Sequence, residues 1–124
     1  LANERVQLKA FNAKAIKNRQ EKHRYILITV LLDAKNKGDA KTLCKYAPRY
    51  LDAIYSHLSR NTYQLNSKGK LDIAVNHNDL EPVIKKVDRN KMIMKVEVIQ
   101  GVPKLGKADR VLNREGCVLV PKWL

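Results

Sequence analysis

The sequence is short of acidic and aromatic residues, and each shortage narrows what the protein can be. Twelve Asp and Glu stand against twenty-five Lys and Arg, so the 124 residues carry a net charge of +13. One Phe, one Trp and five Tyr leave Leu, Ile and Val to fill a single small core. Like charges repel in a compact domain, so an excess of this size indicates a polyanionic partner, most commonly nucleic acid.

Long apolar segments are also missing. The longest nearly continuous apolar run, Tyr25 to Leu32, is far shorter than the roughly 20 residues of a membrane-spanning helix. The N-terminal stretch is polar and lacks the apolar segment typical of a signal peptide. We therefore expect no membrane partner and a location in the cytoplasm or at the nucleoid.

Cysteine is nearly absent. Cys44 and Cys117 lie far apart and form no metal-type pair. In an intracellular protein, two buried free thiols are favoured over a disulfide.

The first third of the chain is predicted to be helical. Residues 3–24 have an approximately helical apolar spacing that fades into basic residues, which predicts a basic helical arm over residues 1–24. Its apolar positions are Val6, Leu8, Phe11, Ala15 and Ile16. The run 25–34 could be a buried strand, but a helix is favoured because Lys35 to Gly38 supplies the cations and the glycine of a helix end.

Two further helices are predicted around a proline. Asp39 is a suitable N-cap for a short helix over residues 40–46. Pro48 suits the first turn of the next helix, 49–60. The expected buried stripe of that helix is Leu51, Ile54, Tyr55 and Leu58.

The second half of the chain alternates like strands. We predict a hairpin over residues 63–75 with its turn at Asn66 to Gly69, a strand over 91–99 and a closing hairpin around 111–120. Between them, Asn78 or Asp79 caps a short helix over 79–88. The predicted fold class is therefore α+β: a single small domain, 1–124, with N-terminal helices followed by β-hairpins and one intervening short helix.

The order of elements in residues 25–75 resembles a winged helix-turn-helix, which implies that helix 49–60 enters the major groove of duplex DNA. Residues 76–124 add the short helix and strands. The chain departs from the pattern at Pro48, where a small residue is usual, and at Arg49, where an apolar one is expected. The predicted contacts are Arg49, Tyr50, His57 and Arg60 on the helix, Lys68 and Lys70 on the wing, and Lys14, Lys17, Arg19, Lys22 and Arg24 on the basic arm.

Other features have two interpretations each. A second basic group is either a phosphate-contact patch or ordinary solubilising charge; it contains Lys85, Lys86, Arg89, Lys91 and Lys95. Tyrosines in the basic stretch could stack on unpaired bases, with Tyr50 expected to be exposed and Tyr55 buried. RNA is less favoured than DNA because no RNA-module consensus is present.

Catalysis is not favoured. The three histidines are dispersed, no glycine-rich phosphate loop occurs, and no metal site or cofactor is expected. The sequence thus predicts a non-catalytic nucleic-acid-binding protein, a regulatory or accessory factor of viral or other origin. One alternative is a basic protein-interaction module or an inhibitor that docks on an acidic protein surface. A second is a metal-dependent nuclease using Asp79, Asp88 and Glu97. A homodimer or another protein partner is a separate open alternative.

Overall fold

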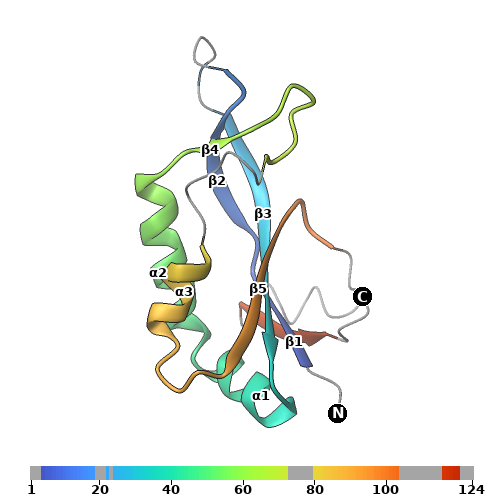
Figure 1. The fold of residues 1–124 in the computed structure, drawn as a ribbon, viewed down its shortest axis with the longest axis vertical. Coiled ribbons are helices and arrows are strands. Elements are labelled where there is room, and N and C mark those ends of the chain that lie inside the picture. The colour runs from blue at the N-terminus through green and yellow to red at the C-terminus, as the bar shows by residue number, and fades with distance from the viewer. Residues whose placement is uncertain (1–3, 19–21, 23, 73–79, 104–115, 121–124) are drawn as a thin grey trace.

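Strands, rather than helices, begin the chain. The computed structural model describes residues 4–18, 22, 24–72, 80–103 and 116–120. In chain order the elements are β1 (Glu4–Leu8), β2 (Phe11–Ile16), β3 (Arg24–Ala34), α1 (Lys37–Lys45), α2 (Ala47–Arg60), β4 (Tyr63–Gln64), α3 (Glu81–Val87), β5 (Ile93–Gln100) and β6 (Cys117–Val120). The fold is α+β, but the predicted order of N-terminal helices followed by hairpins is wrong (Figure 1).

A register shift explains why the apolar residues of 3–24 have the spacing of a helix although the segment contains strands. Strands β1 and β2 both run antiparallel to β3; Gln7 lies opposite Leu31 and Phe11 lies opposite Ile28. Four steps along the first pair of strands therefore match three steps along β3, as at a β-bulge. The extra residue moves the buried positions from even numbers to odd ones. The buried apolar positions are Val6, Leu8, Phe11, Ala13 and Ala15.

The predicted helix over residues 25–34 is also wrong, because this segment forms most of β3. β3 is central in the sheet: β5 pairs with one of its edges, and β1 and β2 pair with the other. Residues 28–34 are all buried and only Thr29 and Asp33 among them are polar, so the strand reads as a nearly continuous apolar run without alternation. The winged helix-turn-helix order predicted for residues 25–75 therefore lacks its first helix, and α1 and α2 follow a strand instead.

The strands join into one six-stranded sheet. Its order is β4-β2-β3-β1-β6, with β5 on the opposite edge of β3. β4 is parallel to β2, and the remaining pairs are antiparallel. Figure 1 shows α2 and α3 side by side along the sheet and α1 near its lower end.

The helix boundaries follow local chemistry. Asn36, not Asp39, is the N-cap of α1, because its Oδ1 accepts a hydrogen bond from the Asp39 amide at 2.8 Å. The prediction that Pro48 opens the next helix is confirmed. In the predicted stripe Ile54 and Leu58 are buried, but Tyr55 is exposed. Residues 78 and 79, predicted to cap α3, lie outside the described residues.

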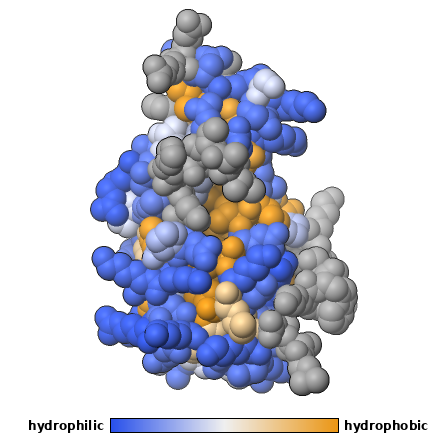
Figure 2. Space-filling model, in the orientation of Figure 1, coloured by the Kyte–Doolittle hydropathy of each residue, from blue (hydrophilic) through white to orange (hydrophobic). Residues whose placement is uncertain are grey.

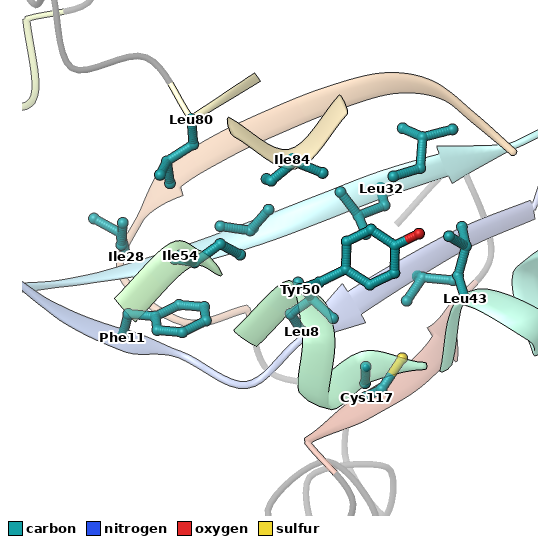
Figure 3. Close-up of a cluster of buried hydrophobic side chains, with 14 of the residues drawn as sticks. Leu8, Phe11, Ile28, Leu32, Leu43, Tyr50, Ile54, Leu80, Ile84 and Cys117 are labelled. Carbon is teal, nitrogen blue, oxygen red and sulfur yellow. The ribbon is translucent and has the colours of Figure 1, made fainter. Parts of the chain in front are cut away.

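One apolar core lies between the helices and the sheet (Figure 3). Phe11, Ile28 and Leu32 rise from the strands toward α2, and Ile54 of α2 and Ile84 of α3 point back at them. Each of these side chains is almost fully removed from water, which makes this layer the main source of stability.

Cys44 of α1 and Cys117 of β6 form a disulfide, so the prediction of two free thiols is wrong. Their Cα atoms lie 5.4 Å apart, within the range that a disulfide spans. The bridge closes a sequence separation of 73 residues and ties the first helix to the last described strand. Sequence spacing gave no indication of this proximity, because β6 reaches α1 only through its pairing with β1.

The opposite face of the sheet contains a buried ion pair. The Arg5 Nε atom donates to Oδ1 of Asp33 at 2.7 Å, and Nη2 lies 3.2 Å from Oε2 of Glu97. The hydrogen bond to Asp33 raises the pKa of the Arg5 guanidinium, against the opposing effect of burial. Three strands are linked by this contact: β1, β3 and β5.

The remaining strand predictions are confirmed in part. Leu65 bridges Leu71 across the predicted turn, and β5 and β6 fall within the predicted ranges 91–99 and 111–120 with one residue beyond the first. Residues 73–75 and 111–112 lie outside the described residues. Among the helices that the structure describes, none combines the length and apolar character needed to cross a membrane.

Candidate functional site

Most of the predicted contact residues meet at one end of the molecule. β2 ends where β3 begins, and their pairing sets Ala15 opposite Arg24. α2 ends at Arg60, and β4 then returns the chain to β2, with Tyr63 opposite Ala15. We call the resulting group the cationic end: Lys14, Lys17, Lys22, Arg24, Arg60, Lys68 and Lys70.

The cationic end holds little compensating charge. In the described segments 14–18, 22, 24–25 and 59–72, Asp72 is the only carboxylate. Five of the seven cations are exposed, and Lys14 and Lys17 are half-buried. A local excess of this kind produces a positive potential that attracts acidic ligands.

A hydrogen-bonded turn holds two of these lysines. The Oδ1 atom of Asn66 accepts from the amides of Lys68 at 2.9 Å and Lys70 at 3.0 Å. The Gly69 amide donates to the Asn66 carbonyl, and Gly69 adopts a φ of 76° that favours glycine. The Gln100 side chain also donates to the Gly69 carbonyl. The turn therefore presents its lysines from a fixed backbone.

A groove of about 290 Å³ opens beside the cationic end, and we call it the tyrosine groove. It is lined by Asn12, Lys14, Tyr25, Tyr55, Leu58 and Ser59. Tyr25 is 69% exposed and Tyr55 is 50% exposed, so two aromatic rings face solvent here. The groove thus combines ring faces and a leucine with amide, hydroxyl and ammonium groups.

The walls of the tyrosine groove are held from within the fold. The Tyr55 ring meets the buried Phe11 ring edge-on, with centroids 4.8 Å apart. The Lys14 Nζ atom donates to the Ser59 carbonyl at 3.2 Å, which links β2 to the last turn of α2. The positions of Tyr55 and Lys14 in the groove are therefore set by contacts with the rest of the fold.

Arg49 lies away from this group, at the other end of α2. It borders a pocket of about 140 Å³, which we call the Arg49 pocket. The lining residues are Tyr46, Arg49, Tyr50, Val87, Arg89, Asn90 and Met92. The Arg49 guanidinium lies over the Tyr46 ring, 5.0 Å from its centroid, as a cation–π contact.

Two predicted contacts on α2 are structural. Tyr50 is only 3% exposed, and burial raises the pKa of its hydroxyl to about 12, aided by the charge of Asp88 and opposed by Arg49. His57 is half-buried, and Asn61 donates to its carbonyl at 2.8 Å, which closes the end of the helix. Tyr50, expected to be exposed, is therefore buried, and Tyr55, expected to be buried, is exposed.

Some site residues were missed or cannot be placed. Tyr25 was assigned to a buried helix, although a strand that begins with Arg24 would leave it outside the core. Arg89, from the second basic group, joins Arg49 in its pocket. Arg19 lies outside the described residues.

The carboxylates proposed for a nuclease have other partners. Asp88 is buried and accepts hydrogen bonds from the amides of Met92 and Ile93 at 3.0 and 2.8 Å. Glu97 pairs with Arg5. Asp79 lies outside the described residues, and within them no group of three or more His, Cys, Asp or Glu is placed to hold a metal ion.

Comparison with known proteins identifies no relative: no family model, no curated protein and no solved structure matches this chain.

Proposed function

We propose that this protein is a non-catalytic docking module that binds an acidic segment of a partner protein at the cationic end and the tyrosine groove. The observation that carries the proposal is the convergence of cations from separate segments beside two exposed tyrosine rings. Tyr and Arg are enriched in protein interfaces, where an aromatic anchor supplies contact area and the charged rim directs association.

The chemistry of the groove specifies the ligand further. Tyr25, Tyr55 and Leu58 offer apolar surface, while Lys14 and the cations around it attract carboxylates. A groove of about 290 Å³ is at the lower limit of ligand sites, so it suits one side chain rather than a large ligand. The expected ligand is an extended acidic segment with one apolar or aromatic residue.

Nucleic-acid binding is the second candidate, and the net charge of +13 favours it. Cations next to exposed tyrosines also suit a strand with unpaired bases. Duplex reading by α2 stays a prediction, but the winged unit that supported it lacks its first helix. The disulfide weighs toward a protein ligand, since such bonds are typical of oxidising compartments. An intracellular location likewise stays a prediction.

Fluorescence anisotropy with three labelled probes tests the two candidates. The probes are a Glu-rich peptide containing one Leu, a Glu-only peptide of the same charge, and a single-stranded DNA of the same charge. We expect the Leu-containing peptide to bind most tightly, and all three affinities to fall with salt. Tighter binding of the DNA would instead establish the nucleic-acid candidate. A fourth probe, a duplex DNA, would then test binding in the major groove.

Matched variants locate the site. Y25A should weaken binding of the Leu-containing peptide about tenfold, since truncation of an interface anchor costs about 1 kcal/mol or more. Y46A, which removes a tyrosine exposed at the other end of α2, is the control. K68Q/K70Q should weaken all probes, and K37Q/K41Q on α1 should have less effect. If Y25A weakens binding no more than Y46A, and K68Q/K70Q no more than K37Q/K41Q, the binding site lies elsewhere.

A further inference from the structure

β5 is an edge strand. It pairs with β3 along Ile28 to Ala34, and no strand of the described residues lies on its outer side. An unpaired edge offers main-chain N–H and C=O groups to another strand. Natural edges are commonly protected by charge and by bulges; here Lys95 lies at the centre, and a register irregularity lies between Asp33 and Ala34.

The pairing with β3 determines which residues of β5 direct their main-chain N–H and C=O groups away from β3. The Gly101 amide donates to the Leu27 carbonyl at 2.8 Å, and Thr29 lies opposite Ile99. In an antiparallel pair, hydrogen-bonded and non-hydrogen-bonded positions alternate. Ile99, Glu97 and Lys95 are therefore bonded inward, while Val98 and Val96 direct their N–H and C=O groups to the free edge.

The side chains of β5 also alternate. Val96 and Val98 lie opposite the core residues Leu32 and Val30, on the helix-covered face. Lys95 and Glu97 lie on the other face. Figure 2 shows an apolar strip near β5 bordered by hydrophilic side chains. Met94 is the extra residue at the register irregularity, because Lys95 lies opposite Asp33 and Ile93 opposite Ala34, and its large apolar side chain is 52% exposed.

We propose that a second copy of this chain pairs with the free edge of β5, antiparallel and with the two-fold axis at Val96. In that register the outward-directed main chain of Val96 meets that of Val96 of the partner subunit. Lys95 then lies opposite Glu97 of the partner subunit, and the two-fold repeats this ion pair on the other side.

The charges select this register. Moving the axis by one residue places Lys95 opposite its own copy, or Glu97 opposite its own copy, and like charges directly opposed are destabilising. Larger shifts that keep the hydrogen bonds in phase separate the two charges altogether. Glu97 is available for the contact, because its side chain is 40% exposed and Arg5 contacts only its Oε2 atom. The inference goes beyond the docking function, because it uses neither the cationic end nor the tyrosine groove.

A charge exchange tests the dimer by sedimentation equilibrium. K95E should raise the dimer dissociation constant at least about tenfold, because it creates two like-charge pairs. Lys95 is exposed and forms no ion pair in the described chain, but it lies opposite Asp33 on β3, so the circular dichroism and unfolding of K95E are compared with those of the unaltered protein. K95E/E97K should restore the dimer, and a mixture of K95E and E97K chains should form heterodimers in preference to either homodimer.

A second variant does not depend on charge or on the Arg5 contact. V96P removes the outward amide at the axis, and proline is tolerated where an edge-strand N–H faces solvent. It should abolish dimerisation while circular dichroism stays that of the unaltered protein. Amide exchange at Val96 and Val98 should slow as protein concentration rises. The proposal is overturned if the unaltered chain is monomeric at every concentration, or if its dimer tolerates both K95E and V96P.

Discussion

The ring of Tyr55, half exposed in the tyrosine groove, rests edge-on against the buried ring of Phe11, with centroids 4.8 Å apart. One residue of the core thereby sets the angle of a ring that faces solvent. The docking proposal makes this pair testable, because Phe11 itself touches no ligand and acts only by positioning Tyr55.

Replacing Phe11 with Leu should weaken binding of the Leu-containing acidic peptide several-fold. The cations are unchanged, so the dependence of affinity on salt should keep its slope. A hydrophobic replacement of similar size costs about 1.5 kcal/mol of stability or less, so the protein stays folded. Anisotropy titrations at two salt concentrations measure both quantities. A change in the salt slope would mean that Phe11 acts through the cations instead.

Replacing Arg5 with Met should lower the free energy of unfolding by about 3–5 kcal/mol, because it leaves the buried carboxylate of Asp33 without its partner. The matched control is K85M, which breaks the exposed pair between Lys85 and Glu81 and should cost about 0.5 kcal/mol or less. Guanidinium unfolding midpoints measure both. Equal costs would show that the Arg5 pair behaves as a surface contact.

Reduction of the disulfide between Cys44 and Cys117 should lower stability by about 4 kcal/mol, because the unfolded chain loses a constraint over 73 residues. The double variant C44A/C117A should show a similar loss and no further response to reductant. Thermal unfolding with and without reductant gives the comparison. Two thiols titrated in the purified, unreduced protein would instead support the free-cysteine prediction.

Tyr50 should ionise late in an alkaline titration. Its pKa is raised from 10.0 to about 12 in the folded protein, chiefly by burial. A pKa that is higher in the folded state contributes stability that is complete below about pH 10 and is lost as pH rises through about 12. We therefore expect Y50F to flatten the fall of stability in that window. The absorbance of tyrosinate during the titration provides an independent check, because the transition at the highest pH should be missing in Y50F.

Gly116 should tolerate alanine less well than Gly69. Both have a positive φ, 78° and 76°, which is strained for residues with a Cβ. A Cβ at Gly116 would also lie 2.9 Å from Cδ1 of Leu51, whereas a Cβ at Gly69 meets nothing within 4 Å. G69A should cost about 1 kcal/mol and G116A more. Similar melting temperatures for the two variants would contradict the close contact.

Local chemistry allowed the second half of the fold to be predicted in part. Pro48 opens α2, Asn66 and Gly69 form the predicted turn, and the β-branched residues after Ile93 form β5. Each signal lies within a few residues of the structure it determines. The first third could not be predicted in this way. The extra residue between β1 and β2 moves the buried apolar positions from even to odd residue numbers, and the resulting spacing of apolar residues is similar to that of a helix.

The candidate site was predicted residue by residue but not as an arrangement. Lys14, Arg60 and Lys70 were expected on three different units, an arm, a recognition helix and a wing. The sheet brings them to one end, because β4 returns beside β2 after α2. Arg49, on the same helix as Arg60, is separated from them by the length of α2.

The sequence by itself determined the excess of positive charge, the single small core, the proline at the start of α2 and the turn from Asn66 to Gly69, since these depend on composition and near neighbours. Only the tertiary structure decided that β1 to β3 are strands, that Cys44 meets Cys117, and that Tyr25 and Tyr55 share a groove. The physical reason is that pairing between distant strands fixes both the hydrogen bonds and the buried face, and neither is encoded within a short window of the chain.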